Sequence, residues 1–272
     1  ALTTQQVKAI VTSELASLSA QTVANLSTLQ VSALSTVQVD SLTANQLQSL
    51  VTAQVRALNT QQVASLSTQD LAALSAEQFT SLSTKQIGVL SSAQADALDA
   101  SYVAALSTQQ LRSLSTAAVT GLVSSDFAAL GSAQLGALAT SQLRAISTDA
   151  LSALGGDTVA MLTSSQTAAL TTAQVASLTS TQLIGLLPSQ VAALTSSQLK
   201  ALSTEQLNSL TTAQFAALTS AQIGALGTDQ VVNLDSEDLG ALSATQVRGI
   251  TTTALVAMDS SDLAALGTHQ LA

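Results

Sequence analysis

The sequence predicts an all-α solenoid of 34 octapeptide repeats, and three observations support this fold class. One frame, Leu-Ser-Thr-x-Gln-Val-x-Ala, runs through all 272 residues, with Leu, Ile or Met at every eighth position from Leu2 to Leu266. The position after this Leu carries residue types that begin helices, and acidic and basic residues favour opposite ends of the same unit. We therefore expect residues 1–272 to form one continuous repeat solenoid that is a segment of a longer repetitive chain.

A new helix is expected in every octad. A continuous α-helix turns by about 100° per residue, so a period of eight would move the Leu by roughly 80° per repeat. The position after the Leu is Ser or Thr in 21 of 34 repeats, Asp or Asn in four and Gly in four, the usual N-cap residues. Three residues later stands Gln in 23 repeats and Asp or Glu in five, as in Ser203 with Gln206 and Thr211 with Gln214. This spacing predicts a capping box at the start of each helix.

Proline and the charged residues predict the same register. Pro188 falls on the first helical position, where proline is tolerated. Of 16 acidic residues, 14 lie at the cap or in the first turn, and six of seven basic residues lie in the last turn, with Lys85 the exception. Each unit is then a helix of about six residues, followed almost at once by the next cap.

Helices this short are stable only when they stack. Their inward face is predicted to carry an aliphatic residue at the fourth helical position, as at Val63 and Leu71, and the Leu three residues later. The residue before the Leu is Ala, Ser or Gly in 30 of 34 octads, which predicts a row of close helix contacts. We expect Leu138→Asp to break the stack locally, and Gln142→Ala to cost only a capping interaction of about 1 kcal/mol.

A β-solenoid is the alternative fold. It is disfavoured because Val-x-Ala-Leu has the spacing of a helix face, because Ala, Leu and Gln favour helices, and because only 12 Gly are present for tight corners. The number of octads per superhelical turn and the handedness stay open, since no second period of 16 or 24 residues is evident.

The composition limits the classes of function. A net charge of -9 with only seven basic residues disfavours nucleic acid and anionic membranes as partners. No apolar run approaches the roughly 20 residues that membrane insertion needs. The absence of Cys and the single His exclude zinc sites built on those residues and a Cys nucleophile. We therefore expect no enzymatic activity, no catalytic residues, no cofactor and no metal site.

Few residues stand out as candidate sites. His269 has no second potential ligand of its kind and is expected to be solvated. The acidic residues between positions 229 and 262 are densest at residues 235–238 (Asp-Ser-Glu-Asp), where helix capping is favoured over calcium binding because the spacing of an EF-hand loop is missing. Calcium binding there stays open. Gly155 and Gly156 read as a weak cap and not as a phosphate loop.

Aromatic residues and hydroxyl rows complete the candidates. Tyr102 takes a Gln position, either as a surface contact or as a neutral substitution. Phe79, Phe127 and Phe215 occupy inward positions and are expected in the core. Ser and Thr fill two successive positions in most octads; capping explains the first row, so the second is the better candidate for a surface that contacts ice, O-glycans or another filament.

The stretches at residues 106–111 (Leu-Ser-Thr-Gln-Gln-Leu) and 172–178 (Thr-Ala-Gln-Val-Ala-Ser-Leu) are typical of the repeat. They resemble the octapeptide-repeat regions of large bacterial surface and secreted proteins, often described as adhesin-like. The resemblance implies an extracellular or cell-surface stalk in bacteria, without catalytic residues.

The expected function is structural: an extracellular fibre, sheath or stalk that forms by solenoid stacking and self-assembly. Residues 1–4 and 267–270 read as ordinary repeats and not as polar end caps, so we expect copies of the chain to associate head to tail or laterally. The alternative is a binding module, an adhesin arm or an ice-binding rod that uses the Ser/Thr rows.

Overall fold

A computed structural model of the chain describes residues 2–271, and these contain helices and connecting segments but no strand. Within this range 34 helices follow one another, one in each octad, so the all-α prediction is confirmed and the β-solenoid is wrong for the described residues. The helices fall into two compact units, Ala1–Ile146 (unit 1) and Ser147–Ala272 (unit 2), which are described separately. That residues 1–272 form a single continuous solenoid stays a prediction.

Unit 1 contains α1(Thr4–Lys8), α2(Thr12–Ser17), α3(Ala20–Ala24), α4(Thr28–Ala33), α5(Thr36–Asp40), α6(Ala44–Ser49), α7(Thr52–Ala57), α8(Thr60–Ser65), α9(Thr68–Ala73), α10(Ala76–Thr80), α11(Thr84–Ile87), α12(Ser92–Asp96), α13(Ala100–Ala105), α14(Thr108–Ser113), α15(Thr116–Gly121), α16(Ser124–Ala128), α17(Ser132–Ala137) and α18(Thr140–Ala145). Unit 2 contains α19(Thr148–Ser152), α20(Gly156–Ala160), α21(Ser164–Ala169), α22(Thr172–Ala176), α23(Ser180–Gly185), α24(Pro188–Ala193), α25(Ser196–Lys200), α26(Thr204–Asn208), α27(Thr212–Ala216), α28(Ser220–Gly224), α29(Thr228–Val232), α30(Ser236–Ala241), α31(Ala244–Val247), α32(Thr252–Ala257), α33(Ser260–Ala265) and α34(Thr268–Leu271).

The ends of the helices confirm the predicted register. The backbone N–H of Gln206 donates to Ser203 Oγ at 3.1 Å, and the N–H of Ser203 donates to Gln206 Oε1 at 2.9 Å, which completes the capping box. Pro188 is the first residue of α24. Many helices end on the Leu in an extended conformation, such as Leu50 with φ -63° and ψ 137°, and no described residue has a positive φ. The turn therefore needs no glycine.

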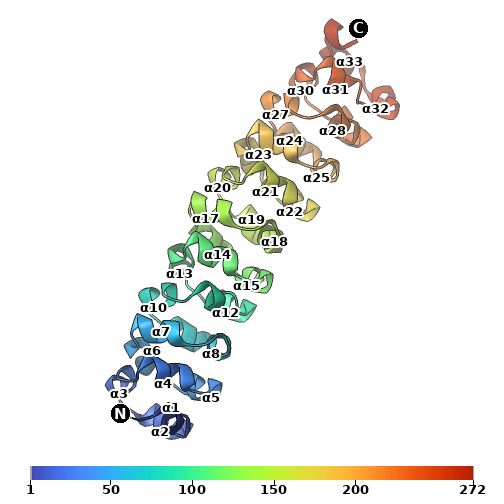
Figure 1. Cartoon of the computed structure of the whole chain (residues 1–272). Coiled ribbons are helices and arrows are strands. Elements are labelled where there is room, and N and C mark those ends of the chain that lie inside the picture. Colours follow the sequence, from blue (N-terminus) through green and yellow to red (C-terminus); the bar gives the residue numbers. More distant parts are fainter. Residues whose placement is uncertain (1, 272) are drawn as a thin grey trace. The chain divides into compact units, whose positions relative to one another are not determined.

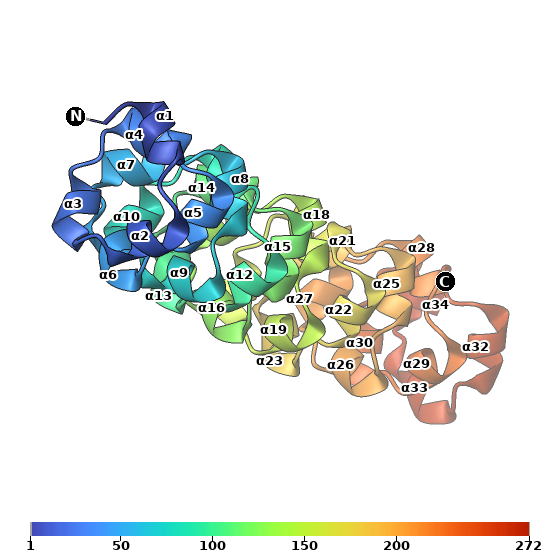
Figure 2. The same ribbon diagram turned by 90° about the horizontal axis from the view of Figure 1, so that it is seen from below.

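Within each unit, each helix packs against the helix three further along the same unit, so three octads make one coil of the solenoid. Figure 1 shows this in unit 1 as three stacks, with α3 and α6, α4 and α7, and α5 and α8 side by side. Figure 2 shows α3 beside α6 and α4 beside α7 from a second direction. This packing supplies the number of octads per turn that the sequence leaves open.

The core of each unit is formed by the two predicted inward positions. Val63 and Leu71 are fully buried, and the Leu that ends a helix is nearly so, as at Leu66 with 3% exposure. Phe79, Phe127 and Phe215 are among the largest fully buried side chains, as the sequence predicts. Burial of two aliphatic side chains per octad is worth about 3 to 6 kcal/mol, which offsets only part of the entropy lost when eight residues become ordered, so the stacking of coils has to supply the rest.

The row of small residues is a contact row, as predicted. A Cβ atom added to Gly121 would lie 2.0 Å from the carbonyl oxygen of Ser92, the first residue of the helix three earlier. At the equivalent position of α6, Ser49 Oγ donates to the carbonyl of Ala20 at 2.9 Å. The residue before the Leu therefore lies directly against the first residue of a helix in the preceding coil.

Candidate functional site

The glutamine of each octad does more than cap its own helix. Gln46 Oε1 accepts the N–H of Thr43 at 2.8 Å, as a capping box requires, but Gln46 Nε2 also donates to the carbonyls of Leu15 and Leu18 at 2.9 and 2.8 Å. Those carbonyls belong to the end of α2 in the preceding coil, where Leu15 O also accepts the N–H of Leu18 at 3.3 Å and the Leu18 carbonyl lies beyond the last bond within the helix. One side chain thus forms hydrogen bonds with a backbone N–H at the start of one helix and with backbone carbonyls at the end of another, and we call it a glutamine rung.

Glutamine rungs recur along both units, each reaching carbonyls 28 to 31 residues earlier in the chain. They are formed by Gln30, Gln38, Gln46, Gln54, Gln62, Gln78, Gln86, Gln94, Gln110, Gln134 and Gln142 in unit 1, and by Gln182, Gln190, Gln198, Gln206, Gln214, Gln222, Gln230, Gln246 and Gln270 in unit 2.

The expectation that Gln142 acts only as a cap is wrong. Its side chain is 2% exposed, and its Nε2 donates to the carbonyls of Leu111 and Leu114 at 2.7 and 2.9 Å. The sequence contains a signal for this second role. Glu and Gln serve a capping box equally well, yet 23 octads have Gln at this position and only Glu14 is a glutamate. Glutamate has no donor for the carbonyls, and the bias towards the amide reflects that need.

Tyr102 is neither a surface contact nor a neutral substitution. It stands at the rung position of α13, and its hydroxyl donates to the carbonyl of Leu74 at 2.7 Å, 28 residues earlier. Its ring packs edge-on against buried Phe79, with centroids 5.4 Å apart. Tyrosine therefore supplies the same donor to the same kind of carbonyl by a different side chain.

Two aspartates also occupy rung positions and are buried, Asp126 with 1% and Asp238 with 4% exposure. Asp126 Oδ2 accepts the N–H of Val123 at 2.8 Å, but its Oδ1 is buried without a hydrogen-bond partner. Burial raises the pKa of Asp126, and burial together with the negative charges of Asp235 and Glu237 raises the pKa of Asp238 to about 6. The sequence does not predict these two perturbed carboxyl groups.

The structure resolves which hydroxyls of the second Ser/Thr row lie together. One stack of unit 1, formed by α2, α5, α8, α11, α14 and α17, has a hydroxyl residue at the first position of every helix. We call this set the hydroxyl column: Thr12, Thr36, Thr60, Thr84, Thr108 and Ser132. Its side chains are exposed or half-buried and make no hydrogen bond within the described residues. The other stacks of unit 1 are interrupted, by Ala20 and Ala44 in one and by Ala76 and Ala100 in the other.

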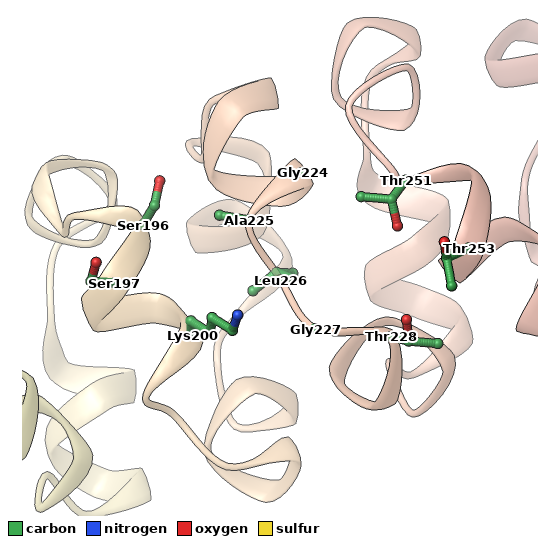
Figure 3. Close-up of a pocket in the computed structure, with 10 residues that line it drawn as sticks. All are labelled: Ser196, Ser197, Lys200, Gly224, Ala225, Leu226, Gly227, Thr228, Thr251 and Thr253. Carbon is green, nitrogen blue, oxygen red and sulfur yellow. The ribbon is translucent and has the colours of Figure 1, made fainter.

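Unit 2 has an open hollow of about 580 Å³ on its surface. Figure 3 shows Ser196 and Ser197 on one side, Thr228, Thr251 and Thr253 on the other, and Lys200 reaching from α25 towards residues 224–227. The lining offers hydroxyl groups and one ammonium group. It contains no carboxylate, histidine or aromatic side chain.

The remaining candidates are not brought together. His269 is exposed in α34, and Gly155 caps α20 without a side-chain hydrogen bond. Within residues 2–271, no group of three or more His, Asp or Glu side chains is arranged to hold a metal ion, the acidic residues of positions 229–262 included. Nor is any helix in that range long and apolar enough to cross a membrane.

Short capped helices, stacked three to a coil and joined by glutamine rungs, define the chain as an octapeptide-repeat α-solenoid. The family model described as the ALTTAQ repeat matches residues 63–100, 103–140, 127–164, 136–172, 191–228, 200–236 and 231–268. Because these matches cover well over half of the sequence, the chain belongs to the ALTTAQ repeat family. The hexapeptide itself, Ala-Leu-Thr-Thr-Ala-Gln, stands at residues 169–174.

Among solved structures, the leucine-rich repeat-containing protein LegL7 from Legionella pneumophila aligns with 86% of this chain and 79% of its own, at 16% identity and a TM-score of 0.23. A TM-score this low carries no argument about the fold. No curated protein matches the sequence.

Proposed function

We propose that this chain is a structural repeat that serves as a stiff stalk or fibre outside a bacterial cell. The observation that carries the proposal is the glutamine rung, which joins each coil to the next inside both units. A rung satisfies the polar groups at helix ends that the stack would otherwise bury unpaired. A stack built in this way can be lengthened octad by octad without any new kind of contact. Its resemblance to the repeat regions of bacterial surface proteins supports the location.

Self-association is the second part of the proposal. The stack that carries the hydroxyl column also exposes Val37 and Val11, by 65% and 59% of their surface. Apolar side chains beside free hydroxyls form a surface that a second copy of the chain can cover, and Lys85 is the one charged residue at the octad position of Val37 on this stack. Lateral packing of such surfaces would thicken a single solenoid into a fibre.

Electron microscopy of the purified chain over a dilution series at neutral pH tests this proposal. Filaments of uniform width that persist on dilution would support self-assembly. Val37→Asp should shorten or disperse them, because it places a charge on the proposed contact while the carboxylate suits the first turn of α5. Ala53→Asp is the matched control, with the same octad position exposed on another stack. Discrete short rods at every concentration would rule out self-assembly and leave a spacer.

The regularity of the hydroxyl column favours a second candidate, a binding rod that recognises a repetitive surface such as ice. It predicts thermal hysteresis in solutions of the chain and its loss on replacing Thr36, Thr60 and Thr84 by Leu. The same replacements at Thr4, Thr28 and Thr52 on another stack are the control. Equal hysteresis in both variants, or none in the unchanged protein, would dismiss ice binding.

A further inference from the structure

Two carboxyl groups stand where the solenoid needs a hydrogen-bond donor. In the regular octads the rung amide accepts one N–H and donates to carbonyls of the preceding coil. An ionised carboxylate can accept but cannot donate. Asp126 accordingly keeps the accepting half of the rung, from Val123, and leaves Oδ1 buried and unpaired. The side chain of Asp238 receives no hydrogen bond from the described residues, although it is 4% exposed.

The surroundings of Asp126 make its negative charge costly. By the register of the rungs, it stands opposite the carbonyls of Ala95, Asp96 and Leu98, which are 31, 30 and 28 residues earlier. Burial is the largest cause that raises the pKa of Asp126, and the negative charges of Asp96 and Asp99 raise it further. Helix α13, which packs against α16, carries no Lys, Arg or His, and neither do α12 and α16; besides the acidic residues already named, Tyr102 is the only ionisable side chain on these three helices.

The surroundings of Asp238 are similar in unit 2. The same register places it opposite the carbonyls of Leu207, Asn208 and Leu210. The packed helices α27 and α33, together with α26, bring no basic side chain. The ionisable groups on these elements and on its own helix are all acidic: Asp235, Glu237, Glu205, Asp259 and Asp262.

We propose that Asp126 and Asp238 are proton-operated rungs. Near neutral pH each carboxylate lacks the hydrogen-bond donor that a rung needs. In mildly acidic medium each carboxyl group takes up one proton from solvent and can then donate. The resulting O–H group is the donor that the glutamine amide supplies in other octads. Mild acid therefore stabilises the packing of α16 and α30 on the preceding coil. Asp70 shows the contrast, since this half-buried rung-position carboxylate already accepts from the N–H and Oγ of Ser67, at 3.1 and 2.7 Å.

The direction of the pH effect follows from linkage. The pKa of Asp238 is raised in the folded state to about 6 from an ordinary value of 3.8, so the folded state binds the proton more tightly than the unfolded state. The extra stability is present below the ordinary value and is lost as pH rises through the raised pKa. Between pH 7 and pH 5 the unfolding equilibrium constant should fall about 10-fold for this group alone.

The test combines a titration with a set of glutamine variants. Carboxyl ¹³C shifts of the unchanged protein should give Asp238 a midpoint of about 6 and Asp126 a midpoint raised above the ordinary 3.8. Urea unfolding at pH 7 and pH 5 should show a gain in stability at pH 5 that the double variant D126Q/D238Q lacks. The double variant should also be the more stable protein at pH 7, because Gln restores both rungs. D70Q is the control and should keep the full pH response.

Two results would overturn the proposal. One is a titration in which both carboxyl groups have midpoints near or below 4. The other is an equal pH response in the unchanged protein and in D126Q/D238Q, which would assign the response to general charge repulsion. The glutamine variants carry the residue usual at this position, so a failure to fold is not expected. Should one occur, the titration of the unchanged protein still decides.

Discussion

Residues 36–94 and residues 100–128 of unit 1 share one core but connect their coils differently. In the first region every rung position holds Gln except Asp70, and each Gln donates to the coil before it. In the second region the rung positions hold Tyr102, Gln110, Ala118 and Asp126. The buried Val, Leu and Phe positions continue unchanged through both. The difference shows that the core defines the stack, while the connection between coils can be made in several ways.

Ala118 shows what happens when the rung is absent. Its side chain carries no donor, and here α15 approaches α12 so closely that a Cβ atom on Gly121 would lie 2.0 Å from the Ser92 carbonyl oxygen. In the rung-rich region the same contact is made by Ser49 and Ser81, whose hydroxyls donate to the equivalent carbonyls. Glycine thus allows direct backbone contact at this position, as Gly249 also does in an octad that keeps its rung Gln246.

The largest effect should come from the core that both regions share. Leu138→Asp places a carboxylate at a position with 5% exposure and should destabilise unit 1 by about 5 kcal/mol. Gln142→Ala should cost roughly 2 to 3 kcal/mol, because it leaves the Ala139 N–H and the Leu114 carbonyl unpaired and removes one of the two donors to the Leu111 carbonyl. Urea unfolding followed by circular dichroism measures both. A cost near 1 kcal/mol for Gln142→Ala would reduce the rung to an ordinary cap.

The close contact of the second region should be sensitive to a single methyl group. Gly121→Ala should destabilise by about 3 kcal/mol, because the added carbon meets backbone and not a movable side chain. Gly136→Ala is the matched control: it lies inside α17, its new methyl meets nothing within 4 Å, and it should stabilise by up to about 1 kcal/mol. Similar thermal unfolding midpoints for the two variants would contradict the proposed role of Gly121.

The smallest effect should come from the substitute rung. Tyr102→Phe keeps the ring against Phe79 and removes only the hydroxyl that donates to Leu74, so it should cost about 1 kcal/mol. Tyr102→Gln restores the usual donor and loses the ring contact. If Tyr102→Phe leaves the urea midpoint unchanged, the tyrosine acts through its ring alone and not as a rung.

Much of the fold was predictable because its signals are local. The N-cap, the capping box and Pro188 depend on contacts within one octad, and the structure confirms each of them. The burial of Phe79, Phe127 and Phe215 follows from their place in the same frame. The roles of Gln142 and Tyr102 were missed because their partners lie 28 to 31 residues away, beyond the range of a pattern read within one octad.

The sequence by itself determined the register, the helix starts and the inward positions, since cap chemistry and helix periodicity act over three or four residues. Only the tertiary structure decided that three octads form a coil. That number selects which hydroxyls of unit 1 align in one column and which carbonyls face each rung. It also buries the carboxyl groups of Asp126 and Asp238. The burial of these two carboxyl groups follows from the packing of the coils, because within one octad each aspartate occupies an ordinary helix-capping position.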